Sequence, residues 1–165
     1  MLAPFVKAGL EAGDQCLTLA ENPDLSELGE ALFQLGVDVD EARTSGRLLG
    51  HEGASTPQAL RGVFERSAVA AEKAGRGLVR VAGDMTWALH KLPHAKALLE
   101  WEAYYDAYFG PRTDFVALCQ YDHTCFGGSA VMYALQTHRV VILGGVLQEN
   151  PFHRDPGEVL AELGG

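Results

Sequence analysis

Residues 78–89 constrain the fold more than any other stretch of this chain. They begin with an apolar run closed by a glycine, which predicts a buried strand, and Thr86 opens the helix that follows. In open α/β sheets, ligands bind at the carboxyl ends of such strands. We therefore expect Asp84, Met85 and Trp87 to face a binding crevice. The structural alternative is that Asp84 or Thr86 only caps the helix and that Trp87 only fills the core.

Strands and helices alternate along the whole sequence. This alternation predicts an α/β fold of three layers, in which helices cover both faces of a mostly parallel central sheet. One helix starts in the preferred way, with the Thr56 hydroxyl as a cap and Pro57 at the first position. The other expected strands are 15–21, 47–52, 114–121 and 139–146, and the expected helices are 2–12, 25–35, 39–45, 57–75, 87–109 with a break near Pro93, 127–137 and 156–163.

Composition narrows the classes of protein that this chain can belong to. Its 165 residues fit one domain, and 22 acidic against 13 basic residues argue against a nucleic-acid surface. No run approaches the roughly 18 apolar residues of a membrane span, and the first residues lack the pattern of a signal peptide. The odd number of cysteines, three, favours free thiols in a reducing cytoplasm. We therefore expect a cytoplasmic globular domain over residues 1–165.

The common nucleotide-binding motifs are missing from the sequence. There is no phosphate-binding Gly-x-x-x-x-Gly-Lys-[Ser/Thr] loop and no Gly-x-Gly-x-x-Gly after a strand. A carboxylate such as Asp84 at a strand end has little to coordinate without a phosphate loop. ATP hydrolysis is therefore not expected.

The segment that begins at Cys119 holds the densest group of polar and sulfur side chains. Cys119, His123 and Cys125 could bind zinc together with a distant His138 or His153, although their spacing matches no recognised zinc pattern. A Cys119 thiol paired with His123 or His138 would instead make a nucleophile for a small hydrolase or lyase. The structural alternative is that Cys119 is a small core residue and that Asp122 caps the following turn.

Two further polar residues have structural alternatives as well. His138 closes a helix, where a histidine can satisfy exposed carbonyls and the helix dipole. Asn150 stands in a turn, where asparagine usually bonds its own backbone. Aromatic and thioether groups gather near the predicted strand ends, which suits a pocket for a small apolar ligand but also a core: Met85, Trp87, Trp101, Tyr105, Tyr121, Phe126 and Phe152.

Several ordered motifs together resemble the MEDS family, the methanogen/methylotroph sensory domain. The motifs are Val81–Leu89, Leu118–Asp122 with Phe126, Thr137-His138 and Asn150–Phe152, while Ala3–Gly13 and Cys16-Leu17 are similar to the family's first helix and following strand. The resemblance covers nearly the whole chain. It implies a sensory module of bacterial and archaeal regulators, often fused to a DNA-binding or kinase-type domain. It also implies sensing of small hydrocarbon derivatives and a distant likeness to RecA-type folds without their phosphate-binding loop.

The sequence departs from the family pattern at two places. Family members usually begin with a strand that carries a His-x-Cys-like segment, and this chain starts after that point. We therefore expect the first strand to be missing or to be supplied by a partner chain. The family more often has Glu where this chain has Asp84, which keeps the charge and shortens the side chain by one methylene.

Together, these observations predict a non-enzymatic cytoplasmic sensory domain of a regulator that binds a small organic ligand. It would act through a signalling output protein or a homo-oligomer, without contact to nucleic acid or membrane; no metal ligand is assigned and the cofactor is unknown. A ligand signals only if it binds two conformations differently, and the loop 122–128 is the expected moving part. The expected ligand contacts are Asp84, Met85, Trp87, Cys119, Tyr121, Asp122, Phe126, His138, Asn150 and Phe152. A hydrolase, a metal-dependent sensor and a partner-binding scaffold remain alternatives.

Overall fold

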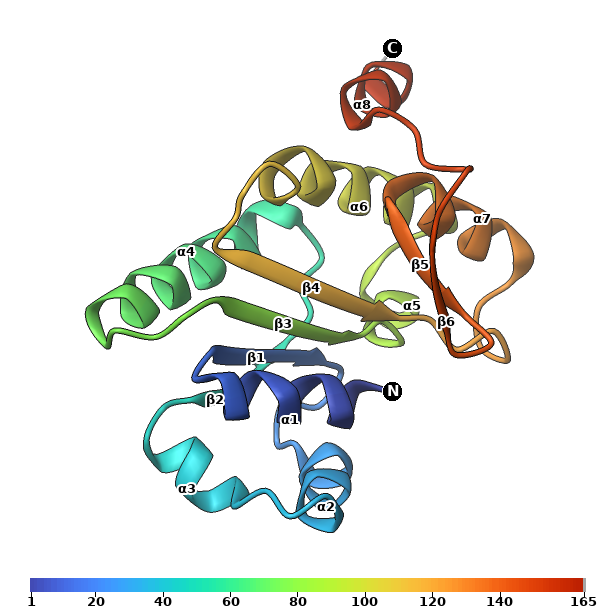
Figure 1. The fold of residues 1–165 in the computed structure, drawn as a ribbon. Helices are drawn as coiled ribbons and strands as arrows, with labels where there is room; N and C mark the ends of the chain where they lie inside the picture. The colour runs from blue at the N-terminus through green and yellow to red at the C-terminus, as the bar shows by residue number, and fades with distance from the viewer. Residues whose placement is uncertain (165) are drawn as a thin grey trace. The chain divides into compact units, whose positions relative to one another are not determined.

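Four parallel strands form the central sheet of the computed structural model, which describes residues 1–164 (Figure 1). The strands are β1 (Gln15–Ala20), β2 (Leu48–Glu52), β3 (Val79–Asp84) and β4 (Phe115–Gln120), in the order β2-β1-β3-β4. In the register, Cys16 lies opposite both Leu48 and Arg80, and Gly83 lies opposite Cys119. The all-parallel arrangement of these strands confirms the prediction of a mostly parallel central sheet.

The chain divides into two compact units, and the sheet belongs to the first. Unit 1 comprises Met1–Trp87 and Thr113–Tyr121, and unit 2 comprises Ala88–Arg112 and Asp122–Gly165. The helices of unit 1 are α1 (Leu2–Ala12), α2 (Ser26–Gln34), α3 (Val39–Thr44) and α4 (Pro57–Lys73). They lie where the apolar periodicity predicts them. That residues 1–165 act as one sensory domain without the usual first strand stays a prediction.

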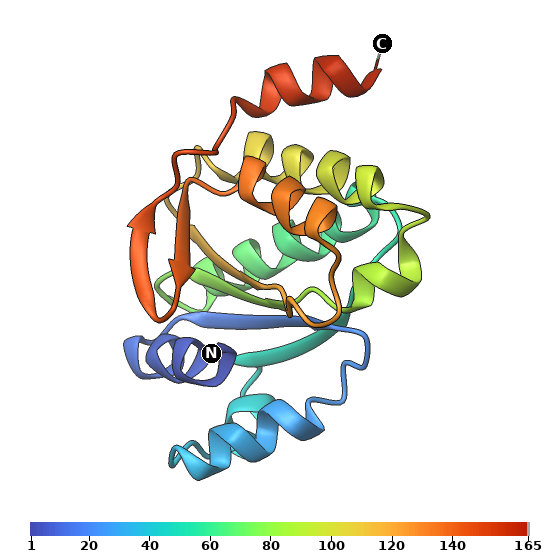
Figure 2. The ribbon, with the colours of Figure 1, turned by 90° about the vertical axis from the view of Figure 1, so that its right-hand side faces the viewer.

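Helices α1 and α4 cover opposite faces of the sheet in unit 1 (Figures 1 and 2). The core under α1 contains Cys16 and Ala82. On α4, Phe64 contacts Phe115 of β4 edge to face, with 6.4 Å between the ring centroids. Since side chains alternate along a strand, the register places Phe115 on the face away from Ala82. Unit 1 is therefore a three-layer αβα structure, as the sequence predicts.

A buried ion pair ties α1, β1 and β3 together at the amino ends of the strands. The Asp14 carboxylate, 3% exposed, accepts hydrogen bonds from the Leu78 N–H at 3.0 Å and from Nε and Nη2 of Arg80 at 3.0 and 2.9 Å. The Arg80 guanidinium also lies over the Phe5 ring, 4.7 Å from its centroid. The Asp14 carboxylate therefore accepts from a backbone N–H and also neutralises the buried charge of Arg80.

One predicted cap is wrong. Pro57 occupies the first turn of α4 as expected, but the Thr56 side chain makes no capping hydrogen bond. The N–H of Ala59, which a capping hydroxyl would bind, donates to the Thr56 backbone oxygen at 3.2 Å. The backbone therefore satisfies the donor that the hydroxyl was expected to satisfy.

Unit 2 is built around helix α6, which packs against α7 and α8. Its shared core contains Leu99, Ala103 and Val159. The predicted break near Pro93 is confirmed, because the helix stops before the proline and a new one starts after it. The elements that follow β3 and β4 are α5 (Trp87–Lys91), α6 (Ala95–Phe109), α7 (Gly128–Thr137), β5 (Val140–Leu143), β6 (Val146–Glu149) and α8 (Pro156–Gly164).

The prediction of a single strand over residues 139–146 is wrong. Strands β5 and β6 form an antiparallel hairpin instead (Figure 1). Gly144 and Gly145 make its two-residue turn, with φ values of 57° and 82°. Such a turn needs positive φ at both positions, which glycine adopts without strain. The apolar residues on both sides of the glycines gave the appearance of one continuous strand.

The helices of this protein are short compared with the bilayer. The longest, α4, has 17 residues, whereas a helix needs about 20 apolar residues to cross the hydrocarbon core. Within residues 1–164, none of the helices has both the length and the apolar character of a membrane span.

Candidate functional site

The carboxyl edge of the sheet in unit 1 gathers the ends of β2, β3 and β4. The Met85 N–H donates to the Gln120 carbonyl at 3.0 Å and so extends the β3–β4 ladder by one step. The Trp87 ring packs directly on Gly53, because a Cβ added to this glycine would lie only 1.9 Å from the ring. Met85 and Trp87 are 1% and 0% exposed. The Trp87 ring therefore fills the core at this edge, and its role as a ligand contact stays a prediction.

Asp84 and Cys119 do not meet at this edge. Asp84 pairs with Gln120 in the register, so alternation along the strands places Asp84 and Cys119 on opposite faces of the sheet. One carboxylate oxygen of Asp84 accepts the N–H of Thr86 at 3.1 Å and its hydroxyl at 2.9 Å. Asp84 therefore caps the turn into α5, as the structural alternative has it. Tyr121, which follows β4, is half-buried.

The loop between β4 and α7 is held by a similar turn in unit 2. The Asp122 carboxylate accepts the N–H and the hydroxyl of Thr124 at 2.8 and 2.7 Å, and these hydrogen bonds lower the pKa of Asp122. The Phe126 N–H donates to the Asp122 carbonyl at 2.9 Å, and the Phe126 ring is buried. Asp122 therefore caps this turn, which was its structural alternative, and the turn directs Phe126 inward.

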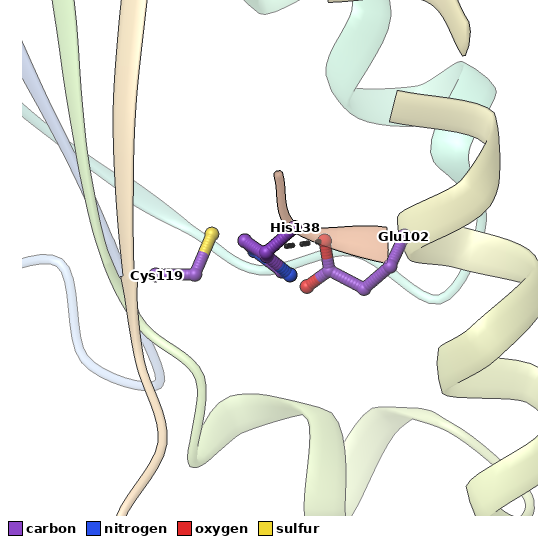
Figure 3. A group of neighbouring side chains, drawn as sticks. All are labelled: Glu102, Cys119 and His138. Carbon is purple, nitrogen blue, oxygen red and sulfur yellow. Dashed lines mark ion pairs between the residues drawn. The ribbon is translucent and has the colours of Figure 1, made fainter. Parts of the chain in front are cut away.

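His138 closes α7 and faces a buried carboxylate. Its Nδ1 donates to the Ala134 carbonyl at 2.7 Å, which confirms the prediction that it satisfies a helix-end carbonyl. Its Nε2 lies 3.8 Å from a carboxylate oxygen of Glu102, drawn as a dashed line in Figure 3. Glu102, on α6, is 4% exposed. Glu102 was not among the residues predicted from the sequence, although a carboxylate between Trp101 and Ala103 on an apolar helix face was a usable signal.

A second acidic side chain on α6 faces another histidine. Asp106 lies one helical turn after Glu102, and its carboxylate is 2.8 Å from Nε2 of His153. Arg139 approaches the same carboxylate at 3.9 Å. Glu102 and Asp106 therefore both lie close to basic side chains within unit 2.

Asn150 fastens the end of α7 to the following turn. Its amide nitrogen donates to the carbonyls of Leu135 and His138, and its amide oxygen accepts the Phe152 N–H at 3.0 Å. Asn150 is 7% exposed, whereas Phe152 is 55% exposed. The last bond confirms that Asn150 bonds the backbone of its own turn. Asn150 therefore has a structural role, and the Phe152 ring faces solvent.

The cysteines differ in their exposure. Cys16 is fully buried beneath α1, and burial raises the pKa of its thiol to about 11. Cys119 is half-buried and Cys125 is exposed. Since the thiolate is the reactive form, Cys16 is chemically inert in the folded chain.

Unit 2 contains a pocket of about 310 Å³ between α5, the start of α6 and the loop before α7. Its floor is formed by buried apolar side chains, among them Leu98 and Phe126. Of the ligand contacts expected from the sequence, only Phe126 lines this pocket. The full lining is Ala88, Leu89, Leu92, Pro93, His94, Ala95, Leu98, Phe126, Gly127, Gly128, Ser129 and Ala130.

Residues 1–139 match the family model described as MEDS, the methanogen/methylotroph, DcmR sensory domain. The chain belongs to the MEDS family. The transcriptional repressor DcmR of Methylorubrum extorquens (strain DSM 6343 / CIP 106787 / DM4) is 29% identical over 135 residues. The alignment covers 82% of this chain and 51% of the repressor, so the chain spans about half the length of this curated relative. No solved structure matches the chain significantly.

The MEDS match covers unit 1 and the part of unit 2 up to residue 139, but not every predicted contact. It includes the pocket and the contacts from Asp84 to His138, whereas Asn150 and Phe152 lie beyond its last residue. The resemblance read from the sequence is therefore confirmed for the family. Which residues of this MEDS domain contact a ligand stays a prediction.

Proposed function

We propose that this MEDS domain is the sensory part of a prokaryotic signalling or transcription regulator and that it responds to a small organic, hydrocarbon-derived ligand. The observation that supports this most is membership of the MEDS family together with similarity to a transcriptional repressor over 135 residues. The apolar pocket in unit 2 supports the ligand class, because pockets for small organic molecules are mostly apolar with few polar groups.

The domain would work without catalysis. The carboxylates of Asp84 and Asp122 each accept two hydrogen bonds from a threonine two residues later, and Nδ1 of His138 is bound to a helix carbonyl. Groups engaged in this way stabilise turns and helix ends. Three free cysteines agree with an intracellular, cytoplasmic location. The signal would pass to an output protein or through a change of homo-oligomer.

Native mass spectrometry of the freshly purified protein, read beside its denatured mass and a metal analysis, tests this function. We expect a retained organic mass that leaves the protein chemically unchanged. We also expect hydrogen exchange to differ between the loaded and the stripped protein, since a signal requires two conformations with different ligand affinity. A ligand that is converted to product, or a bound metal in place of an organic mass, would contradict the proposal.

A further inference from the structure

We propose that the pocket between α5, α6 and α7 is the signal site, and that it takes a small, uncharged, mostly apolar molecule with one hydrogen-bond acceptor. This inference rests on the proposed sensory function and gives it a location and a ligand chemistry. From the sequence alone, the ligand was expected at the carboxyl ends of the strands. There, Met85 and Trp87 are buried in the core and Asp84 is engaged in a cap.

The size of the pocket limits the ligand. A volume of about 310 Å³ lies at the lower end of the range of small-molecule pockets, roughly 300 to 1,000 Å³. It equals about ten water molecules at their share of liquid volume, roughly 30 Å³ each. A molecule of fewer than about ten non-hydrogen atoms therefore fits, and a nucleotide or peptide does not.

The lining favours an uncharged ligand. Its buried floor consists of Ala88, Leu98, Phe126 and Ala130, and Leu89 and Pro93 stand at the more exposed rim. Within the described residues 1–164, the lining of this pocket includes no Asp, Glu, Lys or Arg. A charged molecule would lose its hydration here without meeting an opposite charge, which is unfavourable.

His94 and Ser129 supply the polar recognition at the rim. The Ala97 N–H donates to Nδ1 of His94 at 3.0 Å, so this nitrogen carries no proton. A neutral imidazole with an unprotonated Nδ1 holds its proton on Nε2, which is then a donor. Ser129, at the start of α7, also lines the pocket, and its hydroxyl is a second donor. Two donors above an apolar floor favour a ligand with a carbonyl, ether or hydroxyl oxygen.

The glycines at the mouth allow the pocket to be filled without disturbing the fold. A Cβ added to Gly127 or Gly128 meets no atom within 4 Å, and neither glycine has a positive φ. Gly128→Leu therefore places a side chain in open space beside the cavity. Gly164→Leu is the matched control, because Gly164 is also helical and open but does not line the pocket.

The experiment is an NMR titration of the ¹⁵N-labelled protein with cyclohexanone, a neutral acceptor of suitable size, and with cyclohexanecarboxylate as its charged counterpart. We expect cyclohexanone to shift the amides of residues 88–98 and 126–130 saturably, and the carboxylate to bind at least tenfold more weakly. Gly128→Leu should weaken cyclohexanone binding at least tenfold, and Gly164→Leu should leave it unchanged. His94→Ser keeps a capping side chain but removes the imidazole Nε2–H donor and its reach, so binding should weaken about fivefold.

Different results separate this inference from the proposed function. Shifts that centre on residues 84–87, tighter binding of the carboxylate, or binding unaffected by Gly128→Leu would overturn the pocket while leaving a sensory role intact. The pocket would also be overturned if native mass spectrometry finds the retained organic ligand bound to Gly128→Leu as it is to the unchanged protein. Saturable binding in the pocket with no change of hydrogen exchange anywhere outside it would support the site and contradict the sensory function.

Discussion

Replacing Asp14 by Asn tests whether the buried ion pair holds unit 1 together. The substitution keeps the shape of the side chain and an oxygen that can accept the Leu78 N–H, but it removes the charge opposite Arg80. Arg80 cannot easily turn away to water, because its stem is packed against α1. A Cβ on Gly9 would lie 2.4 Å from Cδ of Arg80, which shows how closely the helix backbone approaches the stem.

The magnitude follows from the burial of the two partners. Their side chains are 5% and 17% exposed, and breaking a buried pair by removing one charge costs about 3 to 5 kcal/mol. Since Asn keeps the backbone hydrogen bond and Arg80 keeps its position over Phe5, we expect the lower end, about 3 kcal/mol. Glu65→Gln is the control. Its pair with Arg61 is 3.0 Å long but more than 40% exposed on both sides, so its loss should cost under about 0.5 kcal/mol.

The assay is urea unfolding followed by tryptophan emission in a Trp101→Phe background. The chain has two tryptophans, so this background leaves Trp87, in the core of unit 1, as the reporter. The free energy of unfolding of Asp14→Asn is compared with that of the background and of Glu65→Gln. A loss below about 1 kcal/mol, or equal to that of the control, would refute the argument that this pair is a main support of unit 1.

Four further outcomes are expected. Burial raises the pKa of Cys16 from 9.0 to about 11, so on raising the pH the thiol loses its proton in the unfolded chain before it does in the folded chain. The free energy of unfolding should therefore fall between pH 9 and 11. Urea unfolding at a series of pH values should show this fall, and the fall should be smaller in Cys16→Ser. Asn150→Ala removes three hydrogen bonds and should cost about 3 kcal/mol in thermal unfolding. Gly145→Ala forces a positive φ on alanine and should cost about 1 kcal/mol in chemical denaturation, whereas no loss would contradict the turn geometry. Thr124→Ala should raise the pKa of Asp122 part of the way toward its ordinary value in a carbon-detected NMR titration, because it removes the hydroxyl hydrogen bond that contributes most to the low pKa and leaves the backbone N–H bond in place.

Helix ends and breaks that depend on neighbouring residues were predicted correctly from the sequence. The apolar period of residues 2–12 and the glycine after it give α1, which ends at Gly13 in the left-handed conformation. The break at Pro93 follows from the missing N–H of proline. The hairpin was missed because four apolar residues precede Gly144 and two follow Gly145, so periodicity alone could not show the reversal.

The candidate site was harder to predict, because its residues are brought together by tertiary structure. Strand-end placement correctly located Asp84, Met85 and Trp87 at the carboxyl edge of the sheet, but it could not tell a buried ring from a ligand contact. That distinction depends on Gly53, more than thirty residues earlier in the chain. In the same way, the approach of the His138 ring to the Glu102 carboxylate depends on the packing of α6 against α7, which no sequence pattern specifies.

The chain enters unit 2 twice and leaves it once in between, and this has a practical consequence. Unit 2 takes residues from Ala88 to Arg112, returns the chain to unit 1 for β4, and then resumes at Asp122. No single cut can therefore release either unit whole, and a truncation before β4 would take a strand out of the sheet. The two tails are more useful handles: Met1 belongs to unit 1 and α8 to unit 2, so a donor and an acceptor dye at opposite ends of one polypeptide would label the two units separately.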